Sequence, residues 1–582
     1  MCGIAGIWGV EPRVVDHVDP RYMAHRGPDG STTLHGANWT MLGTHLCILP
    51  GVRSNTSLCA AGLQQRSGIA FNGEIFNYRD VAASLGVSVQ SDTDLLSALM
   101  GRDPASWIEK VGGMFAIAIC RSDELILIRD RFGIKPLFYT RNGAGRTSYR
   151  FASELKALIQ ERDDQVVLDR SILSEISAFG FAEHSERTLI SEIMQVPPGC
   201  IVRLRIDGSV NTTRFGKAIC QSRDLQKRKQ EEAASVLKDL LHMSVSAQVR
   251  HDDCKKAFFL SGGVDSTALV YSAVAQGLDV HTLTLSADGN DEDAVWAQQV
   301  AATLGTCHTE VHWNVDDFWR ALGPYIRNVE TLELPGVFDA FGGLAFYALC
   351  QEAKKIGVRV VFTGEGADEL FGGYYWPYTH PLGFVDRLRS QAEPFADVKS
   401  YLRSFFPHPE DPVLYRELVF QWMLGAALTN YHLWCVDRCS MAFSIEARPP
   451  FLDDHLVDYA VRLPVPFLCN DRETKIVLRD VLRNDLCRVG LSGLLGRRKL
   501  AMPSAATKFS ESFRDVAQKV YCPVKSGRHP FRKSLRDDAA SLLSFDLFYF
   551  LMVERRAAPV SDVEWLEIVT RLRFHHESPI RW

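Results

Sequence analysis

The stretch Phe258–Thr267 constrains the fold most, because it joins an apolar run to a glycine-rich turn and then to a helix start. A short apolar run bounded in this way is typical of a buried strand. Two further apolar runs of strand length, His281–Leu285 and Val358–Thr363, are separated by helical patterns. Strands that alternate with helices predict a parallel sheet covered by helices, and therefore an α/β fold.

The turn itself, Ser261-Gly262-Gly263-Val264-Asp265-Ser266, has the chemistry of a phosphate site. Backbone N–H groups and hydroxyls at a helix N-terminus suit an anion. The turn lacks the lysine of a Walker loop. It resembles instead the PP-loop of enzymes that cleave ATP between the α and β phosphates. A second element, Phe362–Tyr374, places acidic residues beside flexible glycines, a combination suited to Mg²⁺ and pyrophosphate.

The length of 582 residues predicts two or three domains. Residues 1–205 carry short apolar runs between glycine turns, which favours a strand-rich first domain. Residues 206–232 are largely polar and indicate a linker. Residues 233–582 form the second domain, which is mainly helical from about residue 383. The stretch from about Ser504 onward matches no motif, and we expect helices there with one face toward the core.

Cys2 is the candidate nucleophile of the first domain. Removal of the initiator Met would give Cys2 a free α-amine, whose pKa of roughly 8 lets it act as the base for its own thiol. Asn72 and Gly73 can aim an amide and a backbone N–H at one point, as an oxyanion hole requires. Glu74 and Asp92 supply carboxylates of the kind that hold a substrate ammonium group.

These residues lie in segments that together resemble the class II glutaminase domain of asparagine synthetases: Cys2–Gly6, Arg26–Gly30, Asn72–Tyr78, Arg129–Tyr139 and Phe151–Ala157. The resemblance implies an N-terminal-nucleophile (Ntn) αββα sandwich. It also implies a role for each matching residue: Cys2 as nucleophile, Asn72 and Gly73 as the oxyanion hole, and Arg26, Glu74 and Asp92 as glutamine contacts.

One position departs from the family. The family carries an Arg-Leu-Ser-Ile segment after its Arg-Gly-Pro-Asp motif, and the matching segment here is His45–Ile48. The arginine expected to hold the α-carboxylate of glutamine is therefore His45. Imidazole cannot form arginine's bidentate contact and is mostly neutral at pH 7. Glutamine binding is then either weaker, or supported by Arg53 instead.

The second domain resembles the synthetase domain of the same family, through Ser261–Ser266, Phe362–Tyr374, Val436–Asp453 and Glu473–Arg479. By this resemblance Glu365 belongs to the acyl-transfer site, and Lys475 lies near the phosphates, where its charge would stabilise departing pyrophosphate. Asp265 and Asp368 are the implied Mg²⁺ ligands. The implied ATP contacts are Leu260, Ser261, Gly262, Gly263, Asp265, Ser266, Leu285, Thr363 and Gly364.

The expected acyl pocket departs from that of asparagine synthetases. The segment Glu330–Phe346 is apolar and glycine-rich where the family has a short polar motif, and Cys435 stands where the family usually has lysine. After Lys499, the family's glycine-rich tail is replaced by Leu500–Ala505. An apolar pocket favours an apolar or larger acid over aspartate, because burying an unpaired second carboxylate is costly. Phe338, Phe341 and Phe346 are the candidates for its wall.

The sequence thus predicts an enzyme that hydrolyses glutamine at Cys2 and passes ammonia to an acyl-adenylate, forming asparagine or the amide of a specialised carboxylate. The expected cofactors are ATP and Mg²⁺, and the expected partners are glutamine and a carboxylic acid, with a homodimer as a candidate assembly. The net charge of −5 calls for no nucleic acid, and the start of the chain lacks the pattern of a signal peptide, so a cytoplasmic location is expected. A cyclising amide ligase and a silent glutamine-binding scaffold are the competing hypotheses.

Overall fold

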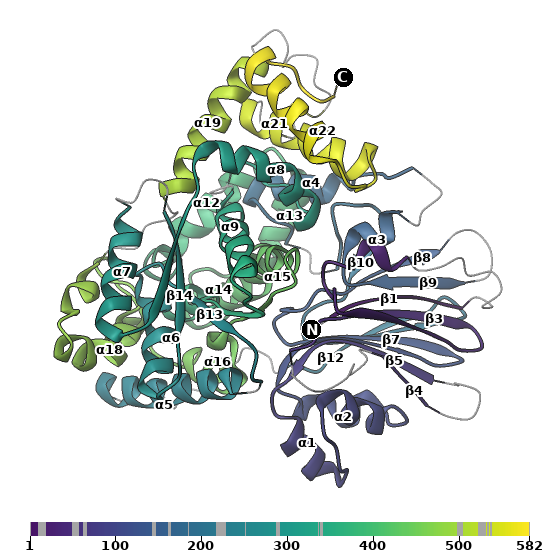
Figure 1. Ribbon diagram of the computed structural model, residues 1–582, viewed down its shortest axis with the longest axis horizontal. Coiled ribbons are helices and arrows are strands. Elements are labelled where there is room, and N and C mark those ends of the chain that lie inside the picture. The colour runs from purple at the N-terminus through teal and green to yellow at the C-terminus, as the bar shows by residue number, and fades with distance from the viewer. Residues whose placement is uncertain are drawn as a thin grey trace.

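The structure is a computed structural model of the whole chain. It describes residues 2–9, 19–48, 58–61, 67–142, 147–160, 165–183, 186–216, 229–250, 252–286, 291–335, 337, 341–497, 504–521, 531, 535 and 538–580. Arg53, Phe338 and Leu500 lie outside these residues, as does the side chain of Cys2. Figure 1 shows a strand-rich domain beside a larger helical one, with the C-terminal helices at one end of the latter.

The first domain contains two antiparallel six-stranded sheets. One sheet has the order β10-β8-β9-β1-β3-β2: Ile193–Gln195, Phe138–Asn142, Ser148–Ala152, Cys2–Trp8, Trp39–His45 and Gly30–His35. The other has the order β12-β11-β7-β6-β5-β4: Val210–Arg214, Cys200–Arg205, Glu124–Arg129, Gly113–Cys120, Ser67–Ile75 and Leu58–Ala61. The first domain is therefore strand-rich, as its short apolar runs predict.

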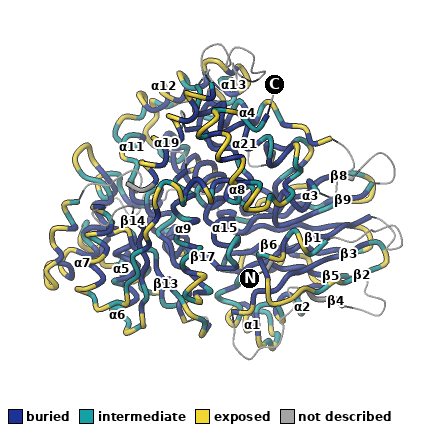
Figure 2. The backbone as a smooth tube through the Cα atoms, turned by 45° about the horizontal axis from the view of Figure 1, so that its top comes forward, coloured by how far each residue is buried: buried dark blue, intermediate teal, exposed yellow. Residues whose placement is uncertain are grey.

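Four layers follow from the way these sheets are covered. Ile4 and Trp39 of one sheet pack with Ala118 and Leu127 of the other in a core between them. The outer face of the second sheet packs against α1 (Tyr78–Leu85) and α2 (Asp92–Leu99). The outer face of the first packs against α3 (Leu155–Gln160) and α4 (Arg170–Phe179). The predicted αββα sandwich is confirmed, and most of its strands are buried along most of their length (Figure 2), whereas β2 and β12 are largely exposed.

The end of the first domain differs from the prediction. Strand β12 falls in the segment 206–232, which the polar composition suggested as a linker. All five of its residues are exposed, so the sequence pattern gave no sign of a buried face. It nevertheless pairs with β11, from Cys200 opposite Arg214 to Leu204 opposite Val210. The first domain therefore extends through Arg214.

The second domain is built on a parallel five-stranded sheet of order β15-β14-β13-β16-β17: Cys307–His312, His281–Ser286, Lys256–Phe259, Val360–Phe362 and Glu446–Arg448. The strands expected near residues 257, 281 and 358 are its three central members. Helices α5 (Gln230–Val249), α6 (Val264–Ala275), α7 (Glu292–Leu304), α8 (Val315–Val329) and α9 (Gly342–Lys355) accompany it. The predicted parallel sheet is confirmed.

The described part of the chain after β16 is mainly helical. The helices between β16 and β17 are α10 (Ala367–Phe371), α11 (Trp376–Thr379), α12 (Pro381–Ala392), α13 (Ala396–Phe405), α14 (Pro412–Trp422), η6 (Met423–His432) and α15 (Leu433–Met441). The helices after β17 include α16 (Asp454–Ala460), α17 (Val465–Leu468), α18 (Ile476–Arg488), α19 (Ser504–Val520), α21 (Ala539–Phe548), η9 (Tyr549–Glu554), α22 (Asp562–Thr570) and η10 (Arg571–His575). Phe509 and Phe513 of α19 stack against Phe318 and Trp319 of α8. The stretch after Ser504 is thus helical with a core-facing side, as expected. Within the described part of the chain, no helix is both long and apolar enough to cross a membrane.

Candidate active sites

The glycine-rich turn lies between strand β13 and helix α6, at the carboxyl edge of the parallel sheet. Gly262 has φ +64°, and a Cβ there would come within 2.5 Å of the Cβ of Trp296, so the turn needs glycine at this position. The hydroxyls of Ser261 and Ser266 lie 3.2 Å apart beside the start of α6. Hydroxyls and free N–H groups at a helix N-terminus favour a phosphate.

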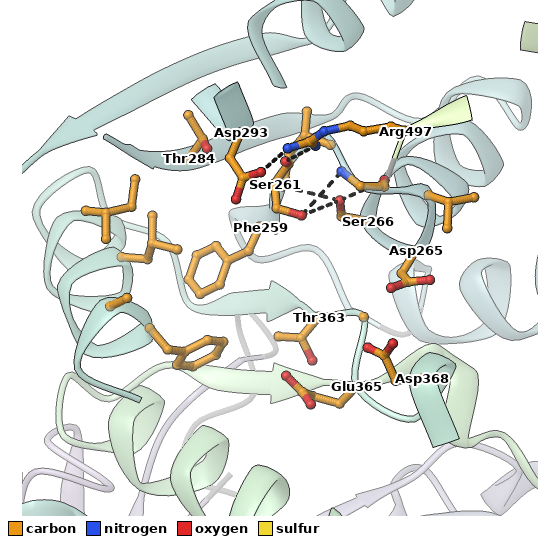
Figure 3. A pocket seen from close by; sticks show the side chains of 18 of the residues that line it. Phe259, Ser261, Asp265, Ser266, Thr284, Asp293, Thr363, Glu365, Asp368 and Arg497 are labelled. Atoms are coloured by element: carbon orange, nitrogen blue, oxygen red, sulfur yellow. Dashed lines mark hydrogen bonds and ion pairs between the residues drawn. The ribbon is translucent and has the colours of Figure 1, made fainter. Parts of the chain in front are cut away.

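The turn faces a cavity of about 350 Å³, which Figure 3 shows from close by. Every predicted ATP, metal and catalytic residue of this domain except Gly262, itself part of the turn, lines it: Leu260, Ser261, Gly263, Asp265, Ser266, Leu285, Thr363, Gly364, Glu365, Asp368 and Lys475. Residues separated by more than 200 positions are therefore brought together, because β13, β14 and β16 end at one edge of the sheet.

Lys475 bridges two carboxylates in this cavity. Its Nζ lies 2.7 Å from Oδ1 of Asp368 and also contacts Oδ2 of Asp265. Burial lowers the pKa of Lys475, but the two carboxylates outweigh burial and raise it above its usual value. Gly373 leaves room for this arrangement, since a Cβ at that position would meet Asp368 Oδ1 at 1.8 Å.

Sequence reasoning missed Arg497 and Asp293, which line the same cavity. Arg497 donates from Nη1 to the carbonyl of Ser261 at 3.1 Å and pairs through Nη2 with Asp293 (Figure 3). Asp293 lies in the first turn of α7 and Arg497 just after the last turn of η8 (Ser492–Gly496). Neither belongs to a glycine-rich motif, so no local signal marked them.

The three phenylalanines predicted for the acyl pocket have different positions. Phe346 lines the cavity and meets Phe259 edge to face, with ring centroids 5.0 Å apart. Phe341 does not line it, which corrects the prediction: it is 2% exposed and packs against Phe509 and Phe513 in the core. Gly342 lines the cavity, and a Cβ added at this position would meet no atom within 4 Å.

The second site lies in the first domain, where β1, β3 and β5 come together. The register of β1 with β3 sets Cys2 opposite His45. Asn72 and Gly73 lie on β5, and Gly73 has φ +143°. A Cβ on Gly73 would come within 2.0 Å of the carbonyl oxygen of Met114, so only glycine fits there. Asn72 is completely buried.

Glu74 and Asp92 form an acidic pair beside this strand. Burial raises the pKa of Glu74 well above its usual value, and the charges of Glu446 and Asp92 raise it further. Burial likewise raises the pKa of Asp92, although its carboxylate accepts hydrogen bonds from the backbone N–H groups of Ile75 and Thr93. Two crowded carboxylates are a ready site for a cation such as a substrate ammonium group.

His45 is buried, with 4% of its surface exposed, and its Nε2 lies 2.8 Å from the hydroxyl of Thr32 on β2. Burial lowers the pKa of His45, which favours a neutral imidazole. His45 can therefore offer a substrate a neutral hydrogen bond, without the charge of an arginine.

Arg26 lies at the interface between the two domains. It is fully buried, and its guanidinium donates at 2.8 Å both to Glu154 of its own domain and to Asp437 of the second domain. The structure thus gives Arg26 an interdomain contact, which was not predicted, and its contact with glutamine stays a prediction. Asp437 also lies 3.5 Å from Nζ of Lys135, so the domain interface contains a buried network of charges.

Both halves of the chain match known families. Residues 1–215 match the glutamine amidotransferase domain, and residues 236–544, more than half of the chain, match asparagine synthase. The chain belongs to the asparagine synthase family. It is a carbon–nitrogen ligase of the glutamine-hydrolysing asparagine synthase type.

Relatives in this family align over most of the chain. Asparagine synthetase [glutamine-hydrolyzing] 3 of Bacillus subtilis (strain 168) is 27% identical, covering 84% of this chain and 85% of the relative. Asparagine synthetase B [glutamine-hydrolyzing] of Escherichia coli (strain K12) is 26% identical, covering 82% and 78%. Among solved structures, glutamine phosphoribosylpyrophosphate amidotransferase from B. subtilis is 18% identical, with a TM-score of 0.27 over 48% of this chain and 65% of that one.

Position 435, a departure from the asparagine synthase family, lies in the interior of α15. Cys435 is 4% exposed, and burial raises the pKa of its thiol well above the usual value. The negative charges of Glu333 and, to a smaller extent, Glu365 raise it further, whereas Arg438 lowers it. The thiol at position 435, where the resemblance predicts a lysine, is therefore neutral.

Proposed function

We propose that the chain is an ATP-dependent amidotransferase that hydrolyses glutamine in its first domain and forms an amide through an acyl-adenylate in its second. The observation that carries this proposal is that secondary structure connects the two sites. Glu74 of the first site is near enough to Glu446 on β17 for the charge of Glu446 to raise its pKa. Strand β17 pairs with β16, with Arg448 opposite Phe362, and β16 leads directly into Thr363–Glu365 at the ATP cavity.

In the first half-reaction, the thiolate of Cys2 attacks the side-chain carboxamide of glutamine and ammonia leaves. Water then hydrolyses the thioester and releases glutamate. Asn72 and the backbone N–H of Gly73 donate to the oxyanion of the tetrahedral intermediate. Glu74 and Asp92 bind the ammonium group of the substrate, and His45 offers a neutral hydrogen bond to its carboxylate.

In the second half-reaction, a carboxylate oxygen of the acyl substrate attacks the α-phosphorus of ATP, and pyrophosphate leaves. The turn Ser261–Ser266 holds the phosphates, and the ammonium group of Lys475 stabilises the charge of the leaving group. Two hard carboxylates, Asp265 and Asp368, are suitable ligands for Mg²⁺, which would neutralise phosphate charge when bound. Ammonia from the first site then attacks the acyl carbon, AMP leaves, and Glu365 accepts a proton from the nitrogen.

The acyl substrate we propose is a carboxylic acid that is larger or less polar than aspartate. Phe346 and Phe259 give the cavity an aromatic wall. Cys435, which does not itself line the cavity, is a neutral thiol where the resemblance to the family predicts a lysine that could pair with a second carboxylate. A second carboxylate buried without a cation is costly.

The test is ATP–pyrophosphate exchange with aspartate and with a panel of apolar and aromatic carboxylic acids. We expect exchange that depends on an acid, with an apolar or aromatic acid at least tenfold better than aspartate in kcat/KM, which corresponds to about 1.4 kcal/mol. Efficient exchange selective for aspartate would refute the substrate class but leave the amidotransferase intact. An absence of acid-dependent exchange with every acid would contradict the adenylation itself.

A further inference from the structure

A histidine outside every recognised motif faces Glu365. His432 ends η6, a π-helical segment that joins α14 to α15 in one continuous helical stretch. π-helical turns inside longer helices are frequent at functional sites, because the wider turn changes the direction of its side chains. The segment brings an imidazole next to the loop that follows β16.

Each ring nitrogen of His432 faces a different carboxylate. Nδ1 lies 4.0 Å from Oε2 of Glu365, and Nε2 lies 4.0 Å from Oε1 of Glu369. The hydroxyl of Tyr374 lies 3.4 Å from the same Nε2. These distances are longer than strong hydrogen bonds, but they are short enough for charges to interact.

The surroundings distinguish the two carboxylates. The side chain of Glu369 is 3% exposed, whereas those of Glu365 and His432 are 26% and 23% exposed. The buried Glu369 and the hydroxyl of Tyr374 therefore fix one edge of the imidazole, while the other edge meets the carboxylate that reaches the cavity. This geometry orients Glu365 through a side chain that does not itself line the cavity.

We propose that His432 is a positioning residue, which orients the carboxylate of Glu365 and favours its ionised form while the amide is made. The proposal rests on the proposed function, because Glu365 is assigned there to proton transfer. When the ammonia nitrogen attacks the acyl carbon, the bond from that carbon to the AMP oxygen breaks and one N–H proton passes to Glu365. A nearby cation lowers the pKa of a carboxyl group, so His432 keeps Glu365 able to accept this proton.

Other charged groups lie near this cluster. Asp265 and Asp368 lie close enough to Tyr374 to raise the pKa of its hydroxyl, together with Glu365 and Glu369. Lys475 contacts both aspartates, and it offsets their negative charge at the phosphate end of the cavity. The imidazole of His432 faces the acyl-transfer end, where Glu365 and Glu369 lie.

The test compares His432→Gln with the wild type in two assays: ATP–pyrophosphate exchange with the acid that drives wild-type exchange fastest, and amide formation from ammonium chloride across a pH series. Gln keeps a hydrogen-bonding side chain but removes the ionisable ring. His408→Gln is the matched control, since His408 is 68% exposed and pairs with the exposed Glu410.

We expect exchange by His432→Gln to stay within about twofold of the wild type, while kcat for amide formation falls on the order of tenfold or more. The acidic limb of the rate profile should move to higher pH, because Glu365 loses its neighbouring cation. Tyr374→Phe removes the hydroxyl that contacts the imidazole of His432. This variant should lower kcat for amide formation and raise the pH of the acidic limb, both by less than His432→Gln does. If His432→Gln has an unchanged rate of amide formation and an unchanged pH profile, the proposal is overturned. It is also overturned if exchange and amide formation fall by the same factor in this variant. If the wild-type protein itself shows no exchange with any acid, the adenylation is refuted instead.

Discussion

Arg26 donates a hydrogen bond of 2.8 Å to Asp437 across the interface between the two domains, and both side chains are fully enclosed. The aspartate also faces Lys135 at 3.5 Å. Burial raises the pKa of Asp437, but the charges of Arg26 and Lys135 outweigh burial and lower it below the usual value. The interface thus depends on a carboxylate that must stay ionised.

Replacing Asp437 with Asn should destabilise the chain strongly, because the buried Lys135 and Arg26 would both lose the negative charge of Asp437, although Arg26 would keep its pair with Glu154. Breaking a buried pair in this way costs roughly 3–5 kcal/mol. The measurement is the free energy of unfolding in urea. Asp454→Asn is the control, since its pair with Arg131 also joins the domains but Asp454 is 38% exposed; its loss should cost less than about 1 kcal/mol. Equal losses in the two variants would disprove the importance of the buried network.

Stability should also fall in acid for the same reason. The pKa values of Asp437 and Glu154 are lowered in the folded state, so their contribution is complete above the unfolded values of about 4 and is lost as the pH falls through the folded ones. Unfolding free energies measured from about pH 6 to pH 3 should decline more steeply in the wild type than in Asp437→Asn. Parallel slopes would contradict this assignment.

Asp265→Asn and Asp368→Asn should each reduce ATP–pyrophosphate exchange by a factor on the order of a hundred, since each removes a hard anionic ligand and a partner of Lys475. Glutaminase activity, which belongs to the other domain, should stay within about twofold and serves as the internal control. Normal exchange in both variants would exclude the proposed Mg²⁺ role.

The sequence predicted those elements whose signals are local. The turn at Ser261–Ser266 and the glycine at position 73 were predictable because tight backbone geometry demands particular residues in consecutive positions. The parallel sheet was predictable from apolar runs between helices, and the cavity followed because parallel strands end at one edge.

Residues whose roles depend on distant partners were not predictable. Arg26 lies in a motif that suggested a glutamine contact, but its partner Asp437 is 411 positions away. Phe341 was predicted to face the acyl pocket, but the aromatic residues of α19 draw it into the core. Strand β12 has no apolar face, and His432 gains its neighbours only from a π-helical turn. None of these relationships leaves a periodic or local trace in the sequence.

Replacing His45 with Arg should lower the KM for glutamine, because arginine can form a charged bidentate contact with the α-carboxylate. A hydrogen bond to a charged group contributes roughly 1.5–3 kcal/mol. Arginine is longer than histidine and must fit beside Thr32. The double variant His45→Arg/Thr32→Ser, which has a smaller side chain at position 32, therefore serves as a companion to His45→Arg. His35→Arg, at an exposed position of β2, is the control for added charge. A KM that stays the same or rises would mean that another group already holds the α-carboxylate.

The central claim is that ammonia made at Cys2 is consumed at the cavity of the second domain. The most direct measurement is amide formation by Cys2→Ala, with glutamine or ammonium chloride as nitrogen donor and the best exchange substrate as acid. We predict that glutamine-dependent amide formation falls at least a hundredfold, whereas ammonium-dependent formation stays within about twofold of the wild type, because the nucleophile acts only in the first step. Wild-type glutamine-dependent activity in Cys2→Ala, or equal loss with both donors, would contradict the account.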